Sequence, residues 1–337
     1  MKEPTIHDIS HLARVSHGTV SNVLNGRQSV REELALRVND AAAKLGYRRN
    51  INAASLRSNQ TDMVAVVVPN IENAFFAELV SALEHIGVTE GRGVMFLTTG
   101  EDEVRARRQI HNLISRRVDG LILVPSFDLQ PMIEDLRRYG VPVVLLDRVE
   151  SSNPFPTVAV DNRQAGRVGG EHLFTGGYKR VAFFGHAHEH WILDQRRDGF
   201  LEAAREAGTT ELCQTYELSL DPEEVHQATL RILGDGNRVD AIFAASNIAA
   251  KGAIPAIQSL GLRIPEDIGL LVMDDFEALT LLSPGISVVA QPSAAIAEAG
   301  WRILQQLIAG KQPQSSHLRL PAKLIIRGST QLVQVSR

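Results

Sequence analysis

The chain has 337 residues, a formal net charge of −4, 44% hydrophobic residues and 22% charged residues, a composition typical of a soluble protein with two or three domains. Its longest apolar runs, such as "MVAVVVP" and "VPVVLL", are too short to cross a bilayer, so we expect no membrane partner. The N-terminal "MKEPTIHD" lacks an apolar signal sequence, and the single Cys213 excludes an intrachain disulfide bond. We therefore expect a cytoplasmic protein.

Charge is distributed unevenly along the chain. Residues 1–60 contain nine Lys/Arg and five Asp/Glu, a balance of +4, whereas the remainder contains 26 and 34, a balance of −8. A basic head on an acidic body favours contact between the head and a polyanion. A small domain can also carry a few net charges by chance, so charge alone does not decide the function.

The first 46 residues contain three helix patterns. Thr5 is a suitable N-cap for the first helix and Ser16 for the second. Ser29 and Glu32 form an S-x-x-E capping box for the third helix, and Gly46 is a natural stop. The expected apolar stripes are Ile6, Ile9, Leu12 and Ala13, then Val20, Val23 and Leu24, then Leu34, Val38, Ala41 and Leu45.

The second helix has an outer face that is small, polar and almost uncharged. Only Arg14 and Val15 separate it from the first helix, a spacing that predicts a helix-turn-helix. A helix with such a face fits a major groove about 12 Å wide, so we interpret it as a recognition helix for double-stranded DNA. A small helical bundle with a polar exterior is the alternative. The candidate DNA-binding residues of this helix and its cap are Ser16, His17, Gly18, Thr19, Ser21, Asn22 and Asn25.

These residues suit two kinds of DNA contact. His17 and Asn22 can reach base edges, and Asn is suited to a bidentate contact with adenine. The hydroxyl and amide groups of Ser16, Thr19, Ser21 and Asn25 suit phosphate contacts that fix register.

A polar linker follows Gly46. Its middle, "NAASLRS", predicts a helix of about two turns, which is marginal in water by itself. Leu56 is then an exposed apolar residue in this linker. It either packs on a neighbouring domain or acts as a wedge in a DNA minor groove, in a segment that folds on DNA.

The segments "TIHDISHLARVSHGTVSNVLNGR", "LGYRRN…ASLRS" and "IIRGST" resemble the lactose-repressor and galactose-repressor (LacI-type) family of bacterial transcription regulators, over almost the whole chain. The resemblance implies that residues 50–58 form a hinge helix, with Asn50, Ala53 and Leu56 among the DNA-binding residues, and that Thr5 contacts DNA. It also implies that His17, Gly18 and Asn22 set operator preference, although Asn22 stands where an arginine is common in the family.

From residue 63 short apolar runs alternate with helical patterns, which predicts parallel sheets covered by helices. The pattern pauses near 149–156 and restarts, which favours two similar lobes with a cleft. The expected fold class is α/β, with a helix-turn-helix head and a two-lobed, parallel-sheet body. The resemblance implies a periplasmic-binding-protein-like body whose chain crosses between the lobes three times. We expect a DNA-binding domain at 1–48, a hinge and linker at 49–61, and an effector-binding and dimerisation domain at 62–337.

Ligands of such sheets bind beyond the carboxyl ends of the strands. Amides, carboxylates, arginines and an aromatic ring at those ends suit a polyhydroxylated ligand, although any one of them could instead be a helix cap or a surface ion pair. By resemblance, Arg196 of "RRDGF" and Asp275 of "MDD" hold the effector. The candidate effector-binding residues are Asn73, Phe75, Ser126, Arg148, Asp161, Trp191, Arg196, Asn247, Asp275 and Gln291; Asn70 and Asp147 occupy similar strand ends.

One departure from the family bears on the ligand. Ser246-Asn247 replaces the usual Asn-Asp after the "FAA" strand, which removes a carboxylate from the cleft. Because Arg148, Arg196 and Lys251 remain, we hypothesise a sugar acid or a sugar phosphate rather than a neutral sugar.

Other functions have weaker support. "HAHEH" places three alternate histidines, His186, His188 and His190, but no cysteine lies near them, so a loop at the cleft mouth is favoured over a zinc site. We find no G-x-G-x-x-G after the first strand, no Walker A motif, no H-E-x-x-H and no G-x-S-x-G, so we expect neither an enzyme nor a cofactor. A periplasmic sugar-binding receptor would need a signal peptide and no DNA-binding head.

The sequence therefore predicts a homodimeric repressor that binds a pseudopalindromic operator and is controlled by a small sugar-like effector. Release of DNA by an inducer is the default expectation. Corepression, in which the effector tightens DNA binding, stays open, as does a tetramer.

Overall fold

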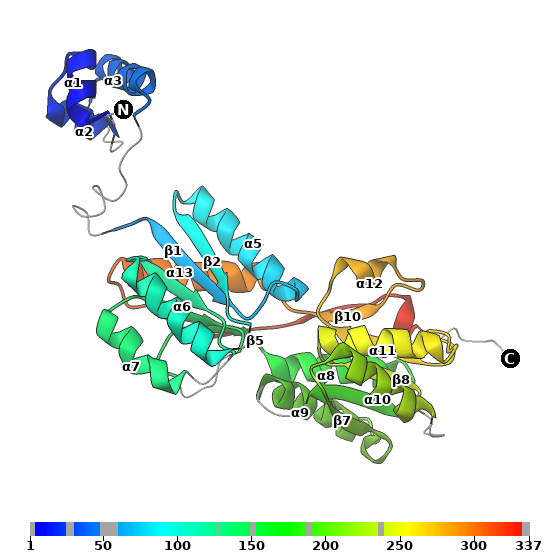
Figure 1. The fold of residues 1–337 in the computed structure, drawn as a ribbon. Helices are drawn as coiled ribbons and strands as arrows, with labels where there is room; N and C mark the ends of the chain where they lie inside the picture. The colour runs from blue at the N-terminus through cyan, green and yellow to red at the C-terminus, as the bar shows by residue number, and fades with distance from the viewer. Residues whose placement is uncertain are drawn as a thin grey trace. The chain divides into compact units, whose positions relative to one another are not determined.

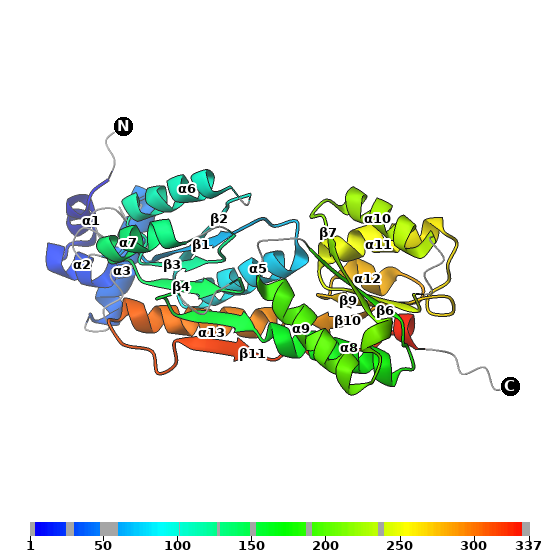
Figure 2. The same ribbon diagram turned by 90° about the horizontal axis from the view of Figure 1, so that it is seen from below.

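The computed structural model describes residues 4–24, 30–47, 60–100, 102–126, 129–148, 153–186, 191–234 and 239–331. The chain divides into two compact units, a head at Met1–Thr61 and a body at Asp62–Arg337. Figures 1 and 2 show both units as ribbons.

The head contains the three expected helices, α1 (Ile6–Ala13), α2 (His17–Leu24) and α3 (Glu32–Leu45). Thr5 caps α1 as predicted: its Oγ1 accepts from the Asp8 backbone N–H, and the Asp8 carboxylate accepts from the Thr5 N–H at 2.8 Å. Ser16 caps α2, because its Oγ accepts from the Thr19 N–H at 3.1 Å. Gly46 ends α3 in the left-handed conformation, with φ of 63°.

Two details of the head differ from the prediction. The third helix begins at Glu32 after the N-cap Arg31, which makes no side-chain cap bond, so Glu32 cannot be the third residue of a box capped at Ser29; Ser29 itself lies outside the described residues. Leu12 is half exposed rather than part of the buried stripe. The buried position next to Ile9 is instead Ser10, whose hydroxyl donates to the Val15 carbonyl at 2.7 Å and so needs no water.

Lobe 1 of the body is a six-stranded parallel sheet with the order β11-β5-β4-β3-β1-β2. Its strands are β1 (Met63–Val68), β2 (Gly93–Thr98), β3 (Gly120–Leu123), β4 (Val143–Leu146), β5 (Thr157–Val160) and β11 (His317–Leu320). Its helices are α5 (Ala74–Thr89), α6 (Glu103–Ser115), α7 (Gln130–Tyr139) and α13 (Ser293–Ile308).

Lobe 2 repeats this arrangement with the order β12-β10-β9-β8-β6-β7, and only β12 runs antiparallel. Its strands are β6 (Val181–His186), β7 (Gln214–Leu218), β8 (Ala241–Ala244), β9 (Gly269–Met273), β10 (Ser287–Ala290) and β12 (Lys323–Ile325). Its helices are α8 (Asn162–Thr175), α9 (Trp191–Glu206), α10 (Pro222–Gly234), α11 (Asn247–Ser259) and α12 (Glu277–Leu281), with short 3₁₀ turns at Thr210–Leu212 and Gly328–Thr330.

The chain passes between the lobes after β5, after β10 and after β11, so the predicted three crossings are confirmed. Each sheet is buried on both faces, as the continuous apolar strands predicted. In β1, for example, Val64 and Val66 pack with Trp301 on one face, and Ala65 packs with Ile110 on the other. Figures 1 and 2 show the two lobes of the body side by side, each with its sheet between helices.

Candidate functional site

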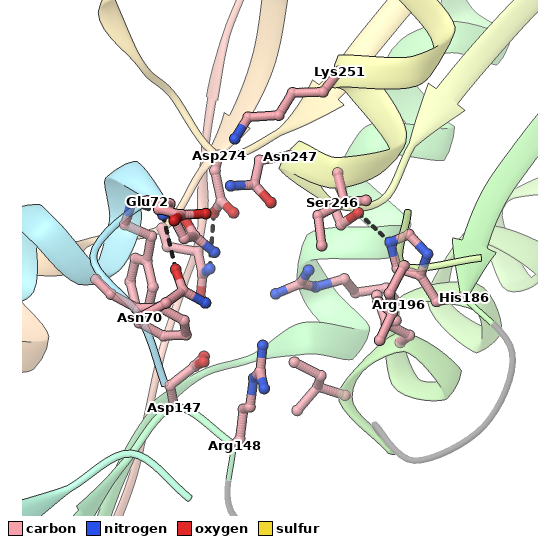
Figure 3. A pocket seen from close by; sticks show the side chains of 18 of the residues that line it. Asn70, Glu72, Asp147, Arg148, His186, Arg196, Ser246, Asn247, Lys251 and Asp274 are labelled. Atoms are coloured by element: carbon pink, nitrogen blue, oxygen red, sulfur yellow. Dashed lines mark hydrogen bonds between the residues drawn. The ribbon is translucent and has the colours of Figure 1, made fainter. Parts of the chain in front are cut away.

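A polar cavity of about 200 Å³ lies between the lobes at the carboxyl ends of their strands (Figure 3). Lobe 1 contributes Asn70, Glu72, Asn73, Phe75, Phe76, Asp147 and Arg148. Lobe 2 contributes His186, Ile192, Leu193, Arg196, Leu220, Pro222, Ser246, Asn247, Ile248, Lys251 and Asp274. Gln291, on the crossing from β10 to α13, completes the lining. This location agrees with the rule that open α/β sheets bind ligands beyond their carboxyl edges.

Arg196 points into the middle of the cavity from α9 (Figure 3). It is only 3% exposed, and its Nε donates to Asn162 Oδ1 at 2.7 Å while Nη1 donates to the Ala245 carbonyl at 2.8 Å. Burial lowers the pKa of this guanidinium, and the nearby carboxylates of Asp274 and Asp147 oppose that shift. The two hydrogen bonds hold the guanidinium plane in place, and an arginine stays protonated in proteins, so the cavity has a fixed cation.

The rest of the R-x-x-G-F motif explains how Arg196 reaches this position. A Cβ on Gly199 would lie 1.9 Å from the Arg163 carbonyl oxygen, and one on Gly166 would lie 1.8 Å from the Arg196 carbonyl oxygen. The two glycines therefore let α8 and α9 pack backbone to backbone, and Phe200 is fully buried beneath them. This close packing brings Arg196 within reach of Asn162 on α8.

Asp147 and Asp274 occupy equivalent places in the two lobes. Asp147 follows β4 and Asp274 follows β9, and each donates its backbone N–H at 3.0 Å to the next strand, to Val158 and Val289 respectively. Both have positive φ, 62° and 74°, a conformation that costs a non-glycine residue on the order of 1 kcal/mol or more. Such strain is typical of residues held for function rather than for stability.

Both carboxyl groups are buried in the cavity wall, and burial raises the pKa of each. The charges of Arg148 and Arg196 oppose the shift at Asp147, and Arg196 and a hydrogen bond from Gln291 oppose it at Asp274. That bond, from Gln291 Nε2 to Asp274 Oδ1, is 2.8 Å long. Asp147 Oδ1 and Gln291 Oε1 are buried and accept no hydrogen bond from any described residue.

His186 ties three strand ends of lobe 2 together. Its Nδ1 lies 2.9 Å from the Ser219 carbonyl oxygen and its Nε2 lies 2.5 Å from Ser246 Oγ. Because a carbonyl can only accept, Nδ1 carries the proton of the neutral ring and the Ser246 hydroxyl donates to Nε2. Burial lowers the pKa of His186, which favours this neutral form. Ser246 Oγ also accepts from the Ala249 N–H and so caps α11.

Six of the predicted effector residues line the cavity: Asn73, Phe75, Arg148, Arg196, Asn247 and Gln291. The Arg148 guanidinium carbon lies 5.4 Å from the centre of the Phe76 ring, which gives the aromatic floor a cation–π contact. Asn73 also caps α5, since its Oδ1 accepts from the Phe75 N–H.

Three predicted residues lie elsewhere. Asp275 is not in the cavity wall; both of its carboxylate oxygens accept from Arg327, at 2.9 and 2.7 Å. Asp161 caps α8 through the Gln164 N–H, and the Ser126 hydroxyl bonds to Thr99. The side chain of Trp191 lies outside the described residues, although its backbone begins α9.

Sequence reasoning assigned no effector role to Asp274, His186, Ser246 or Glu72. Asp274 is the first Asp of the "MDD" motif and immediately follows β9. Successive side chains at a strand end point in opposite directions, so this alternation was the signal that distinguishes Asp274 from Asp275. For His186, the signal was its place as the last residue of β6. Among the described residues no group of three His, Cys, Asp or Glu could hold a metal ion; His188 and His190 lie outside them.

The predicted DNA-binding residues that are described lie on the helix-turn-helix. His17 and Gly18 are exposed at the start of α2, and Thr19, Ser21 and Asn22 on the same helix are partly exposed. Thr5 and Ser16 use their hydroxyls as helix caps. The other predicted DNA-binding residues, Asn25, Asn50, Ala53 and Leu56, lie outside the described residues.

A helix-turn-helix head and a two-lobed body with a polar cleft define a ligand-responsive DNA-binding regulator. Residues 5–50 match the family described as bacterial regulatory proteins, lacI family, and residues 61–327 match the periplasmic binding proteins and sugar binding domain of LacI family. The chain belongs to the LacI family. It is a transcription regulator and not an enzyme.

Relatives match along the whole chain. The ribose operon repressor of Halalkalibacterium halodurans is 31% identical over 326 residues, covering 97% of each chain. Catabolite control protein A of Priestia megaterium is 29% identical over 334 residues, covering 97% of this chain and 99% of its own. The lac repressor dimer bound to operator and the anti-inducer ONPF superposes with a TM-score of 0.85 at 26% identity, covering 98% and 99% of the two chains.

A regulator in complex with cellobiose, CelR, gives a TM-score of 0.71 at 27% identity, covering 97% and 99%. Within the described part of the chain, every helix is too short or too polar to span a bilayer.

Proposed function

We propose that this protein is a transcription repressor whose affinity for a pseudopalindromic operator changes when a small sugar acid or sugar phosphate binds between the lobes. The observation that carries the proposal is the buried Arg196 guanidinium, which two hydrogen bonds hold in place. Beside it lie buried acceptors that receive no hydrogen bond from the described residues.

The buried acceptors favour a ligand with several hydroxyl groups. Asp147 Oδ1 and Gln291 Oε1 accept no bond from the described residues, and an unsatisfied buried polar group costs about 1–3 kcal/mol. Ser246 Oγ, whose proton is directed to His186, can also only accept from a ligand. A sugar hydroxyl supplies the missing donors.

The balance of charge favours an anionic group on that ligand. Arg148, Arg196 and Lys251 reach the cavity from both lobes (Figure 3). Three carboxyl groups, of Glu72, Asp147 and Asp274, also line it, but burial raises the pKa of the last two and so disfavours their charged forms. A carboxylate or phosphate would accept from the guanidinium groups in bidentate fashion.

The size of the cavity favours a monosaccharide. Its volume of about 200 Å³ lies below the range of about 300–1,000 Å³ of pockets that hold drug-sized molecules. One similar protein, a ribose operon repressor, is named for the operon of a monosaccharide.

For the DNA, we propose a symmetric dimer that inserts one α2 helix into each of two successive major grooves, as the similar lac repressor dimer bound to operator suggests. Leu56, outside the described residues, would enter the minor groove between the two half-sites. The effector would alter the spacing of the two heads by changing how the lobes close. Release from DNA is the expected sign of the response, and tighter binding would indicate a corepressor.

A thermal-shift screen tests this proposal. The purified full-length protein is heated with neutral sugars, sugar acids, sugar phosphates and nucleobases. A true effector at about 100 times its dissociation constant should add about 2.7 kcal/mol to the stability of the body. We expect the hits among the acids and phosphates, and we expect them to change the affinity for operator DNA selected from a random pool.

Matched variants locate the binding site. Arg148→Gln and Arg196→Lys should reduce the shift given by an acid, whereas Arg263→Gln should not, because Arg263 pairs with Asp267 on an exposed surface. Hits confined to neutral sugars would contradict the anionic group but keep the cleft. A shift that survives both cleft variants would place the effector elsewhere.

A further inference from the structure

Three histidines lie together on the helix-turn-helix of the head. His7 and His11 on α1 stack with ring centroids 5.2 Å apart, and His17 at the start of α2 meets His7 edge to face at 5.0 Å. All three residues are exposed. We call them the imidazole cluster.

The helix-turn-helix has almost no other source of positive charge. Residues 4–24 contain a single Lys/Arg, Arg14, and a single acidic residue, Asp8, but three of the eleven histidines of the chain. The Asp8 carboxylate accepts from both the N–H and the hydroxyl of Thr5, at 2.8 and 2.7 Å. The permanent charges of the motif therefore cancel, and any positive charge that α1 and α2 gain must come from imidazoles, which change charge between about pH 5 and 8.

The third helix, even with its exposed N-cap Arg31, adds no net positive charge to the head. The charged residues of α3, which packs on α1 and α2, are Glu32, Glu33, Arg37, Asp40 and Lys44. Arg37 donates to the carbonyls of Ala13 and Arg14, and Lys44 pairs with Asp40 at 2.7 Å. Glu32 and Glu33 are exposed in the first turn.

The electrostatic environment of the cluster differs between the free protein and the protein bound to DNA. In the free protein, positive charges on rings about 5 Å apart would repel one another. Beside a duplex, which carries one negative charge per about 1.7 Å of its axis, the same protons are stabilised. The cluster lies where α2 begins, the end of a recognition helix that approaches DNA.

We propose that the imidazole cluster is a phosphate-facing surface that takes up protons when the head binds DNA, so that binding is tighter at about pH 6 than at pH 8. This rests on the proposed DNA-binding function. Because phosphate contacts carry no sequence information, the coupling acts on any duplex, and the operator need not be known to observe it.

Fluorescence anisotropy with the full-length protein and a labelled duplex of mixed sequence tests the proposal, at several potassium chloride concentrations. Each proton taken up should raise the affinity about tenfold for each unit by which pH falls in this window. The dependence on salt should also steepen, by about 0.9 in the log–log slope for each new charge at a phosphate.

The matched variant replaces the three rings by glutamine, which is polar but cannot be protonated. His7→Gln, His11→Gln and His17→Gln together should flatten the pH profile while keeping the affinity measured at about pH 8 within a few fold. The control is His85→Gln on α5 of the body, another exposed histidine, which should keep the full profile. Circular dichroism melts check that each variant folds.

A second measurement needs no variant. Isothermal titration calorimetry of the unmodified protein with the same duplex, in buffers that differ in ionisation enthalpy, counts the protons taken up directly. Binding without proton uptake, or a triple variant that keeps the pH profile, would overturn the proposal while leaving DNA binding intact. Absence of binding at every pH in low salt would contradict the DNA-binding function itself, and this inference with it.

Discussion

At the scale of single residues, the cleft contains carboxyl groups whose burial and backbone conformation lower the stability of the folded protein. Asp147 and Asp274 are buried, strained at φ and held near one another in an environment that disfavours their charged forms. Their neighbour Asp275, by contrast, is engaged in a bidentate ion pair with Arg327. Two adjacent carboxylates therefore contribute to stability with opposite signs.

We expect Asp274→Asn to stabilise the protein at neutral pH and Asp275→Asn to destabilise it. The raised pKa of Asp274 means that the folded state binds more protons than the unfolded state, so stability falls as pH rises from the usual 3.8 through the raised pKa. Removal of the ionisable group should raise the melting temperature by about 2–4 °C for each kcal/mol by which the free energy of unfolding increases.

Differential scanning calorimetry between about pH 4 and pH 8 measures both variants. The increase in melting temperature of Asp274→Asn should become smaller towards the acidic end of this pH range, where the carboxyl group of the unmodified protein is already neutral. A lower melting temperature for Asp274→Asn at neutral pH would show that its charge is stabilising after all. The same variant should lose effector binding, whereas Asp275→Asn should keep it.

At the scale of elements, the crossing of α8 and α9 determines where Arg196 lies. Gly166 and Gly199 are the points of backbone contact, and neither position has room for a Cβ. Packing strain at these positions would be transmitted directly to the guanidinium, because Asn162 and Arg196 belong to the same two helices.

Gly199→Ala should therefore weaken effector binding and stability together. The new methyl group would lie 1.9 Å from the Arg163 carbonyl oxygen, and overpacking of this kind costs about 1–3 kcal/mol. Gly234→Ala on α10 is the matched control, since a Cβ there meets no atom of the described residues within 4 Å. Urea unfolding and effector titration of both variants measure the effect. Equal stability of the two would show that the helices can separate without cost.

The elements were more predictable from sequence than the site. Continuous apolar runs such as "GLIL" and "VVLL" predicted strands buried on both faces, because a parallel sheet covered by helices requires them. Arg196 was predictable because a motif fixed its position. The cavity wall contains Asp274 and not the predicted Asp275, because composition does not reveal which side of a strand end a carboxylate faces. His186 was expected in a loop at the cleft mouth rather than in a metal site. Its hydrogen bonds to Ser219 and Ser246 could not be predicted, because these partners are 33 and 60 residues away in the sequence.

At the scale of the whole molecule, the cleft belongs to both lobes and the two ligands of the protein are thermodynamically linked. If the effector weakens DNA binding by some factor, DNA must weaken effector binding by the same factor, typically about 5–150-fold. An effector that contacts lobe 1 through Arg148 and lobe 2 through Arg196 is suited to bias their closure.

We expect this reciprocity to hold within error once an effector is found. Anisotropy gives the DNA affinity with and without the effector, and calorimetry gives the effector affinity with and without operator. Unequal factors would show that a further equilibrium, such as dimer dissociation, is linked to one of the two ligands. Arg148→Gln should reduce the coupling as well as the affinity, if closure depends on contacts to both lobes.

The three crossings also have a consequence for how the protein is made. Helix α13, which comes from residues 293–308, covers one face of the lobe 1 sheet, where Trp301 packs against Val64 and Val66 and donates to Glu90 at 2.8 Å. The ribosome finishes β1 to β5 more than a hundred residues before it reaches this helix. The head can therefore fold early, but lobe 1 leaves the ribosome with an apolar face exposed. Its solubility during synthesis depends on chaperones, or on lobe 2 emerging quickly enough to bring α13 into place.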